Sequence, residues 1–89
     1  MGAPNQETEQ SASEALASAG DVINPWSTPI QAVSAALGKT LEESRILVEG
    51  MAARKVVQLE ARRGTVTTYL WKPGPTPPGG DLAPERKEK

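Results

Sequence analysis

STPIQAVSAALGKTLEESRILVEG, residues 27–50, contains two helix-start signals separated by very little chain. A threonine is followed three residues later by glutamine at Thr28 and Gln31, and by glutamate at Thr40 and Glu43. In such a capping box the hydroxyl of the first residue accepts the backbone N–H of the fourth, whose side chain accepts the N–H of the first. The sequence therefore predicts that one helix begins at Thr28 and another at Thr40.

The turn between these two helices is expected to be two or three residues long. Ile30, Val33 and Leu37 form one apolar face of the helix that begins at Thr28. Gly38 follows directly, and glycine at this place adopts the left-handed conformation that ends many helices. A turn this short that contains glycine makes the two helices cross at a large angle, as in a helix-turn-helix.

The helix that begins at Thr40 is followed by a predicted β-hairpin. Its apolar face runs through Leu41, Leu47, Val48 and Met51. Residues 56–61 and 65–71 are rich in residues that favour strands, and RRG at residues 62–64 separates them. A glycine in so short a connection is typical of a hairpin turn, so the two runs are expected to pair with each other.

The two ends of the chain differ from this middle part. Upstream, apolar residues recur at helical spacing at Ala12, Leu16, Ala19 and Ile23. They predict a first helix over about 13–22, which Pro25 prevents from continuing. Residues 1–12 are polar, and residues 74–89 are rich in proline and glycine and then charged, so neither segment offers enough apolar surface to offset chain entropy. We therefore expect a disordered acidic arm (1–12), one domain (13–73) and a disordered tail (74–89).

The composition excludes several classes of function. The 89 residues include no cysteine and no histidine, which removes disulfides, thiolate and imidazole metal ligands, and histidine-dependent catalysis. The carboxylates have no partner base, and the sequence has no glycine-rich phosphate loop, so we expect no enzyme activity, metal or cofactor. No apolar run approaches the roughly 20 residues of a membrane span, and the N-terminus lacks a signal-peptide pattern, so a cytoplasmic protein is expected.

Residues 28–72 resemble the winged-helix superfamily of helix-turn-helix domains. TPIQAVSAALG is similar to its second helix, TLEESRILVEGMAARK to its recognition helix and VVQLEARRGTVTTYLW to its wing. The pattern is also similar to a winged-helix small-subunit ribosomal protein and to the small winged-helix protein encoded beside dissimilatory sulfite reductase. The glycine that usually precedes the first wing strand is Lys55 here. The resemblance implies an α+β fold, with three helices followed by a two-stranded β-hairpin wing.

Charge is distributed unevenly along the chain. Residues 1–27 carry four acidic residues and no basic one, whereas residues 28–72 carry seven basic and four acidic residues. The resemblance implies DNA binding, with the recognition helix in the major groove and the wing on the backbone. The residues expected to contact nucleic acid are Lys39, Ser44, Arg45, Arg54, Lys55, Arg62, Arg63 and Lys72. A flexible acidic arm is expected to oppose this binding by competing with phosphate.

The recognition helix and the wing contribute to this hypothesis in different ways. Ser44 and Arg45 lie near the start of the recognition helix, where an arginine can bond the edge of guanine. Arg62 and Arg63 are expected to project together from the hairpin turn and to bond phosphate or enter a minor groove. The other four basic residues would then extend one basic side of the domain.

Each of these patterns also has a purely structural interpretation. Glu42 and Glu43 complement the positive end of a helix, and charged residues at a sheet edge prevent aggregation. Tyr69 and Trp71 alternate along the last strand and share one face, where they either stack on bases or, as we expect, pack in the core.

The leading hypothesis from the sequence is a small DNA-binding winged-helix protein with a regulatory role. The alternative is a winged-helix protein-interaction module without nucleic-acid contact, and a third hypothesis is an RNA-binding or ribosome-associated winged helix. Ile46 and Leu47 make the apolar face of the recognition helix broader than one core contact requires. This breadth indicates a second buried surface, either against the first helix or in a homodimer or a complex with another protein.

Overall fold

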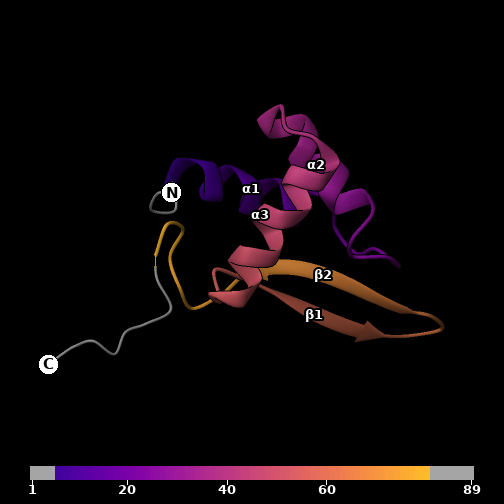
Figure 1. Cartoon of the computed structure of the whole chain (residues 1–89). Helices are drawn as coiled ribbons and strands as arrows, with labels where there is room; N and C mark the ends of the chain where they lie inside the picture. Colours follow the sequence, from indigo (N-terminus) through magenta and orange to yellow (C-terminus); the bar gives the residue numbers. More distant parts are fainter. Residues whose placement is uncertain (1–5, 81–89) are drawn as a thin grey trace, which may run out of the picture.

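The computed structural model describes residues 6–80, which form three helices followed by a two-stranded antiparallel hairpin (Figure 1). The helices are α1 (Gln6–Ser18), α2 (Thr28–Leu37) and α3 (Leu41–Ala53), and the strands are β1 (Val57–Arg63) and β2 (Thr67–Pro73). The helices gather together, and the hairpin extends away from them as a ribbon (Figure 1). No helix within residues 6–80 is long and apolar enough to cross a membrane. The predicted α+β layout of a small winged helix is confirmed.

The core lies where the helices meet the base of the hairpin. Its buried apolar residues are Ala12, Leu16, Ile30, Val33, Val48, Met51, Val56, Val57 and Trp71. The indole N–H of Trp71 donates to the Pro25 carbonyl oxygen at 3.0 Å, and its ring meets Trp26 edge to face with the centroids 5.3 Å apart. The prediction that Trp71 packs in the core is confirmed.

The turn between α2 and α3 forms as the sequence predicts. Gly38 adopts a φ of 66°, and its N–H donates to the Ser34 carbonyl oxygen at 2.9 Å. At the start of α3, Thr40 Oγ1 accepts the Glu43 N–H at 3.0 Å, and Glu43 Oε1 accepts the Thr40 N–H at 3.0 Å. The capping box and the left-handed glycine together fix how α3 leaves α2.

The start of α2 differs from the prediction. Thr28 is the first helical residue, Ser27 takes the cap position, and the Ser27 side chain makes no cap hydrogen bond. The Trp26 ring packs against Trp71, and the backbone N–H of Trp26 donates to Asn24 Oδ1 at 2.9 Å. This anchored turn ends just before Thr28, so the helix begins one residue earlier than a Thr28 cap requires. The predicted capping box at Thr28 is wrong.

The first helix begins earlier than predicted, because Glu9 has partners elsewhere in the fold. Glu9 is only 4% exposed, and its carboxylate accepts hydrogen bonds from the Arg54 guanidinium and, at 2.8 Å, from the Gly79 N–H. Ala12, one turn later, is fully buried. Residues 6–12 therefore belong to the domain, and the prediction of a disordered arm is wrong for them; residues 1–5 lie outside the described part.

The first helix also ends earlier than predicted, at Ser18. Gly20 turns the chain with a φ of 71°. Val22 then joins the edge of β2, where its N–H donates to the Tyr69 carbonyl oxygen at 2.9 Å and its carbonyl accepts the Tyr69 N–H at 2.7 Å. Helical spacing alone assigned Val22 to the helix, but its hydrogen bonds are those of a strand.

Residues 74–80, predicted to start a disordered tail, pack against the domain. The Gly74 N–H donates to the Val56 carbonyl oxygen at 2.9 Å, and the Thr76 N–H donates to the Lys55 carbonyl oxygen at 3.0 Å. A Cβ atom on Gly74 would lie 2.2 Å from that Lys55 oxygen, so only glycine permits this approach. The prediction is wrong for these seven residues, and residues 81–89 lie outside the described part.

The hairpin turn lies further along the chain than RRG suggests. Arg62 pairs with Thr68 and Arg63 with Thr67, so both arginines belong to β1. The turn consists of residues 64–66, and the Gly64 N–H donates to the Val66 carbonyl oxygen at 3.2 Å. The expectation that the two arginines form the turn is wrong.

Candidate functional site

The wing arginines do not form a joint contact surface. Successive residues of a strand point to opposite faces, so Arg62 and Arg63 diverge. Arg62 lies 3.5 Å from a carboxylate oxygen of Asp21 and 3.9 Å from one of Glu60. Arg63 is exposed and has no ion-pair partner among residues 6–80. Of the two, only Arg63 offers an unpaired charge at the end of the hairpin.

Lys72 on β2 is paired across the hairpin with Glu60 on β1. The Lys72 ammonium lies 3.1 Å from Glu60 Oε1. The hydrogen bond from Lys72 and its charge, with a smaller contribution from Arg62, hold the pKa of the Glu60 carboxyl below its usual value. One carboxylate thus partly neutralises two of the cations that were expected to bind nucleic acid.

Arg54 is part of the scaffold. Its guanidinium donates both to the Glu9 carboxylate on α1 and to the Gly80 carbonyl oxygen. The side chains of Arg54 and Glu9 are 19% and 5% exposed. Arg54 therefore joins the end of α3 to the start of α1 and to the segment that follows the hairpin, and its charge is already compensated.

The two predicted base-contact residues of α3 have different surroundings. Ser44 is fully buried, and its hydroxyl donates to the Thr40 carbonyl oxygen at 2.8 Å, so the expectation that it contacts nucleic acid is wrong. Arg45 is exposed, lies 3.0 Å from Glu49 Oε2, and holds its guanidinium 5.6 Å from the centre of the Trp26 ring. The sequence does not indicate that Ser44 is buried, because its burial depends on which side of α3 packs against the rest of the domain.

Two further predicted residues lie at opposite ends of α3. Lys39 is half-buried in the turn before the helix, and Lys55 is exposed two residues after its end. The 13 residues of α3 separate them by about 20 Å at 1.5 Å per residue. With Arg63 at the end of β1, the cations without an ion-pair partner in residues 6–80 occupy three separate places, and the expected continuous basic side does not form.

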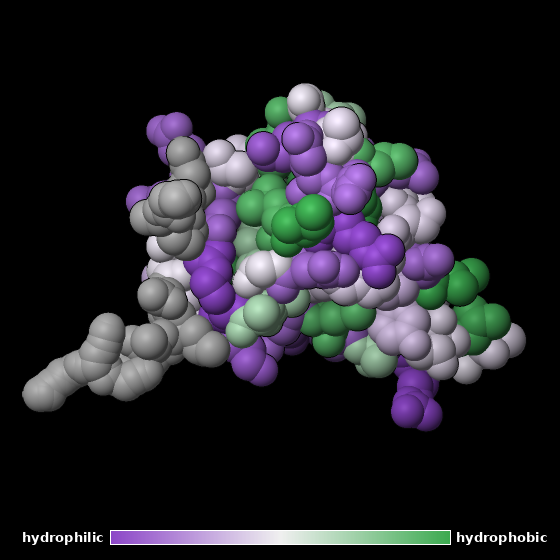
Figure 2. Space-filling view, in the orientation of Figure 1, coloured by the Kyte–Doolittle hydropathy of each residue, from purple (hydrophilic) through white to green (hydrophobic). Residues whose placement is uncertain are grey.

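The outward face of α3 is acidic with an apolar centre. Ile46 is 61% exposed, and Figure 2 shows a small hydrophobic group over α3 that hydrophilic residues surround. Glu42, Glu43 and Glu49 are exposed on the same helix. The pKa of Glu43 is lowered, chiefly by the backbone hydrogen bond from Thr40, so this carboxylate stays charged. Leu47, expected beside Ile46 on an outer surface, instead packs against the core.

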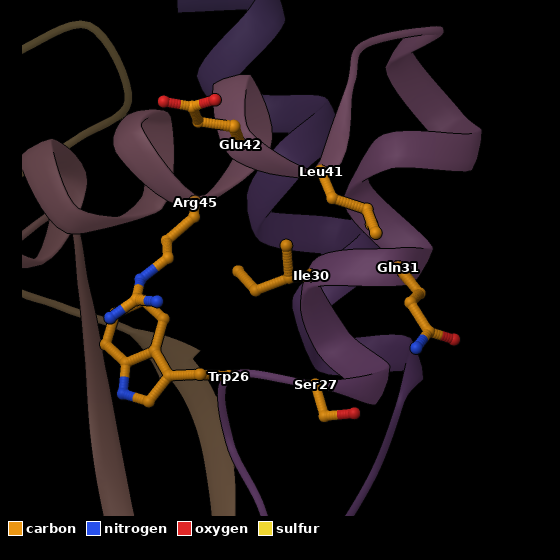
Figure 3. Close-up of a pocket in the computed structure, with 7 residues that line it drawn as sticks. All are labelled: Trp26, Ser27, Ile30, Gln31, Leu41, Glu42 and Arg45. Atoms are coloured by element: carbon orange, nitrogen blue, oxygen red, sulfur yellow. The ribbon is translucent and has the colours of Figure 1, made fainter.

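A groove lies between the N-terminal ends of α2 and α3, and sequence analysis did not predict it. Its cavity measures about 390 Å³. Ile30 lies in its centre, Leu41 and Trp26 stand on opposite sides, and the Arg45 guanidinium covers the Trp26 ring (Figure 3). Leu41, expected on the core face, is 55% exposed because it begins α3 at the edge of this groove. Exposed apolar residues at a helix start cannot be distinguished from core residues by their spacing.

Metal chemistry has no support in the described part of the chain. Within residues 6–80, no group of three or more acidic side chains lies close enough together to hold a metal ion. Comparisons with family models, with curated proteins and with solved structures found no match to this chain. The surface itself must therefore indicate the function.

Proposed function

We propose that this chain is a protein-interaction module with a winged-helix layout, which docks on another protein through α3 and the adjoining groove. The observation that carries the proposal is the charge of the outward face of α3. This face presents Glu42, Glu43 and Glu49 against Arg45 alone. In nucleic-acid-binding winged helices the same face enters the major groove, where phosphates would repel the carboxylates.

Arg45 does not offset this acidity. It is already paired with Glu49 at 3.0 Å and lies over Trp26. A base or phosphate contact would have to replace both interactions. Carboxylates near phosphate are unfavourable, because two unit charges 4 Å apart interact by about 1 kcal/mol in bulk water and by more near a protein surface.

The apolar features of the same side favour a protein partner. Leu41 and Ile46 are exposed by 55% and 61%, and the groove beside Leu41 has an apolar centre at Ile30. Interface centres are enriched in apolar and aromatic anchors and are enclosed by a polar rim. Here Arg45 and Glu49 supply charged groups at the margin, which can select a partner by charge.

The proposal is tested by comparing surface variants that leave the fold intact. Leu41→Ser and Ile46→Ser remove apolar anchors of the proposed surface, and Val66→Ser removes an equally exposed residue of the hairpin turn, 57% exposed. The partner is a protein that binds wild type and Val66→Ser but does not bind Leu41→Ser or Ile46→Ser. It is then purified and titrated against all four chains. Equal binding by all four would place the interaction elsewhere and contradict the proposal.

Nucleic-acid binding is a second candidate, which one observation favours. Lys39, Lys55 and Arg63 have no ion-pair partner among residues 6–80. Phosphate contacts need no continuous patch, and each contact contributes to salt-dependent affinity for DNA or RNA of any sequence. This candidate predicts binding without base specificity, since Ser44 is buried and Arg45 is paired.

A further inference from the structure

Nothing within residues 6–80 requires glycine at position 50. It lies in the last turn of α3, is exposed, and a Cβ atom built on it would meet nothing within 4 Å. Its φ is not positive, so the helix geometry does not require glycine. Glycine weakens a helix interior, and its remaining advantage is close approach of another backbone. The space above Gly50 therefore suits a partner that approaches from outside.

Gly50 and Ile46 form a matched pair on the outward face. Residues four apart lie on one ridge of a helix, and Glu42, Ile46 and Gly50 continue this spacing. The opposite side of α3, formed by Ser44, Val48 and Met51, is buried in the domain. The ridge thus presents a projecting apolar side chain and, one turn later, a depression.

We infer that the partner on this face is a second copy of the chain, whose α3 packs antiparallel on the first. In a pair related by a two-fold axis between Ile46 and Gly50, each Ile46 fits over the Gly50 of the other copy. Such reciprocal contacts are the requirement of a two-fold interface. The inference rests on the proposed protein-interaction function and names the partner for one of its two surfaces.

The charges at the ends of α3 complement each other in the same arrangement. Glu42 is exposed in the first turn of α3, and Lys55 is exposed two residues after its last residue. Antiparallel packing brings the Glu42 of each copy to the end of α3 where the Lys55 of the other copy lies. It also brings the positive end of one helix dipole beside the negative end of the other. A parallel arrangement would instead bring like charges together.

The interface is expected to be small. Two crossing helices of 13 residues bury less than the roughly 1,200–2,000 Å² of standard stable interfaces. Association should therefore be reversible and confined to micromolar or higher protein concentrations. Sedimentation velocity of the full chain from micromolar to millimolar concentration should show a monomer–dimer equilibrium.

Three variants test the contact itself. Ile46→Asp should remove the dimer, whereas Val66→Asp, on the hairpin turn, should leave it unchanged. Gly50→Leu should also remove the dimer, because its side chain fills the depression. The open space at Gly50 lets the monomer accept leucine, so its melting midpoint at low concentration should not fall. A dimer that persists in Ile46→Asp and Gly50→Leu would overturn the inference.

A charge exchange tests the antiparallel direction. Glu42→Lys alone places two lysines near each other at both ends of the homodimer, and Lys55→Glu alone places two glutamates there. Each variant by itself should dimerise at least tenfold more weakly than wild type. An equimolar mixture restores both opposite-charge pairs, so it should associate more tightly than either variant alone and form mainly the mixed dimer.

The outcomes separate this inference from the proposed function. Two results overturn the inference that the partner is a second copy. One is a wild-type chain that stays monomeric at millimolar concentration, and the other is a mixture of Glu42→Lys and Lys55→Glu that associates no more tightly than either variant alone. The proposed interaction function holds without the dimer in either of two cases. In the first, a different protein binds wild type but not Leu41→Ser; in the second, a basic helix of another protein binds at Ile46. If neither occurs, both proposals fail.

Discussion

Lys55 occupies a backbone conformation that lysine rarely adopts. Its φ is 67°, where its Cβ is strained, and it ends α3 in a Schellman motif: the Lys55 N–H donates to the Ala52 carbonyl oxygen and the Val56 N–H to that of Met51, at 3.1 and 2.8 Å. Glycine is usual at this position of a helix end. Lysine at this position therefore has a cost in stability.

We expect Lys55→Gly to stabilise the protein. The change relieves left-handed strain of about 1–2 kcal/mol and loses about 0.4–1 kcal/mol through a more flexible unfolded chain, which leaves a net gain of up to about 1.6 kcal/mol. Urea unfolding measures this difference. Lys55→Ala is the control, because it removes the charge and keeps the strain. An equal gain in both variants would assign the effect to charge and contradict the backbone explanation.

The two threonines of the helix-start signals are expected to differ. Thr40→Ala should lower the free energy of unfolding by about 0.5–2 kcal/mol, because the Glu43 N–H loses its acceptor. Thr28→Ala should change it by less than about 0.5 kcal/mol, since Thr28 is an exposed helical residue without a cap bond. Thermal and urea unfolding of both variants check this. A comparable loss of stability in Thr28→Ala would indicate that the Thr28 side chain caps α2, which contradicts the structure.

Glu43 makes the capping box sensitive to pH. Its pKa lies below the usual value of a glutamate, chiefly because of the backbone hydrogen bond from Thr40, so the folded state favours the carboxylate. The stabilisation is present above the unfolded pKa and is lost as pH falls through the lower folded pKa. Glu43→Gln should therefore lose stability mainly at neutral pH and approach wild type in acid. Urea midpoints measured from neutral to acid pH test this. A constant difference at every pH would exclude charge as the cause.

At the scale of elements, local signals predicted what local contacts determine. The order of three helices and a hairpin, the left-handed Gly38 and the Thr40 capping box all follow from residues within four positions of each other. The boundaries of α1 do not, because its start depends on Arg54 and Gly79, and the chain after its end bonds Tyr69 through Val22. The candidate site was predicted poorly for the same reason: Ser44 is buried by the packing direction of α3, and Asp21, far earlier in the chain, pairs with Arg62 on β1.

The pair of Glu9 and Arg54 should stabilise the contact between α1 and α3 strongly. Glu9→Ala leaves the guanidinium of Arg54 largely buried without its carboxylate, and loss of one partner of a buried pair costs about 3–5 kcal/mol. Glu49→Ala is the control: it breaks the exposed pair with Arg45 and should cost less than about 1 kcal/mol. Urea unfolding compares them. Equal losses would contradict the structural role of Glu9.

Deletion of residues 1–12 was expected from the sequence to remove only an acidic arm and to strengthen DNA binding. The structure gives a different expectation, because the deletion also removes Glu9 and buried Ala12. The shortened chain should unfold at lower temperature than wild type. Far-ultraviolet circular dichroism during heating measures this, and an unchanged midpoint would show that the first half of α1 contributes nothing to the fold.

For the whole molecule, the distribution of charge separates the two possible functions. Cations are paired with carboxylates at α1, on the hairpin and at α3, while the outward face of α3 keeps an excess of acidic groups. The same face exposes Ile46 and adjoins the groove at Leu41. A winged-helix layout arranged in this way suits contact with protein better than contact with phosphate.

The most direct test is fluorescence anisotropy of a labelled mixed-sequence DNA duplex titrated with the full chain at about 50 mM and about 200 mM salt, concentrations between which phosphate contacts weaken measurably. We predict no binding tighter than about 10⁻⁴ M at either concentration, the weak limit of non-specific binding. As a control, Glu42→Lys with Glu49→Lys reverses the charge of the α3 face and should bind at the lower salt. Wild-type binding in the micromolar range that weakens with salt and is reduced by Arg63→Ala would contradict the protein-interaction account.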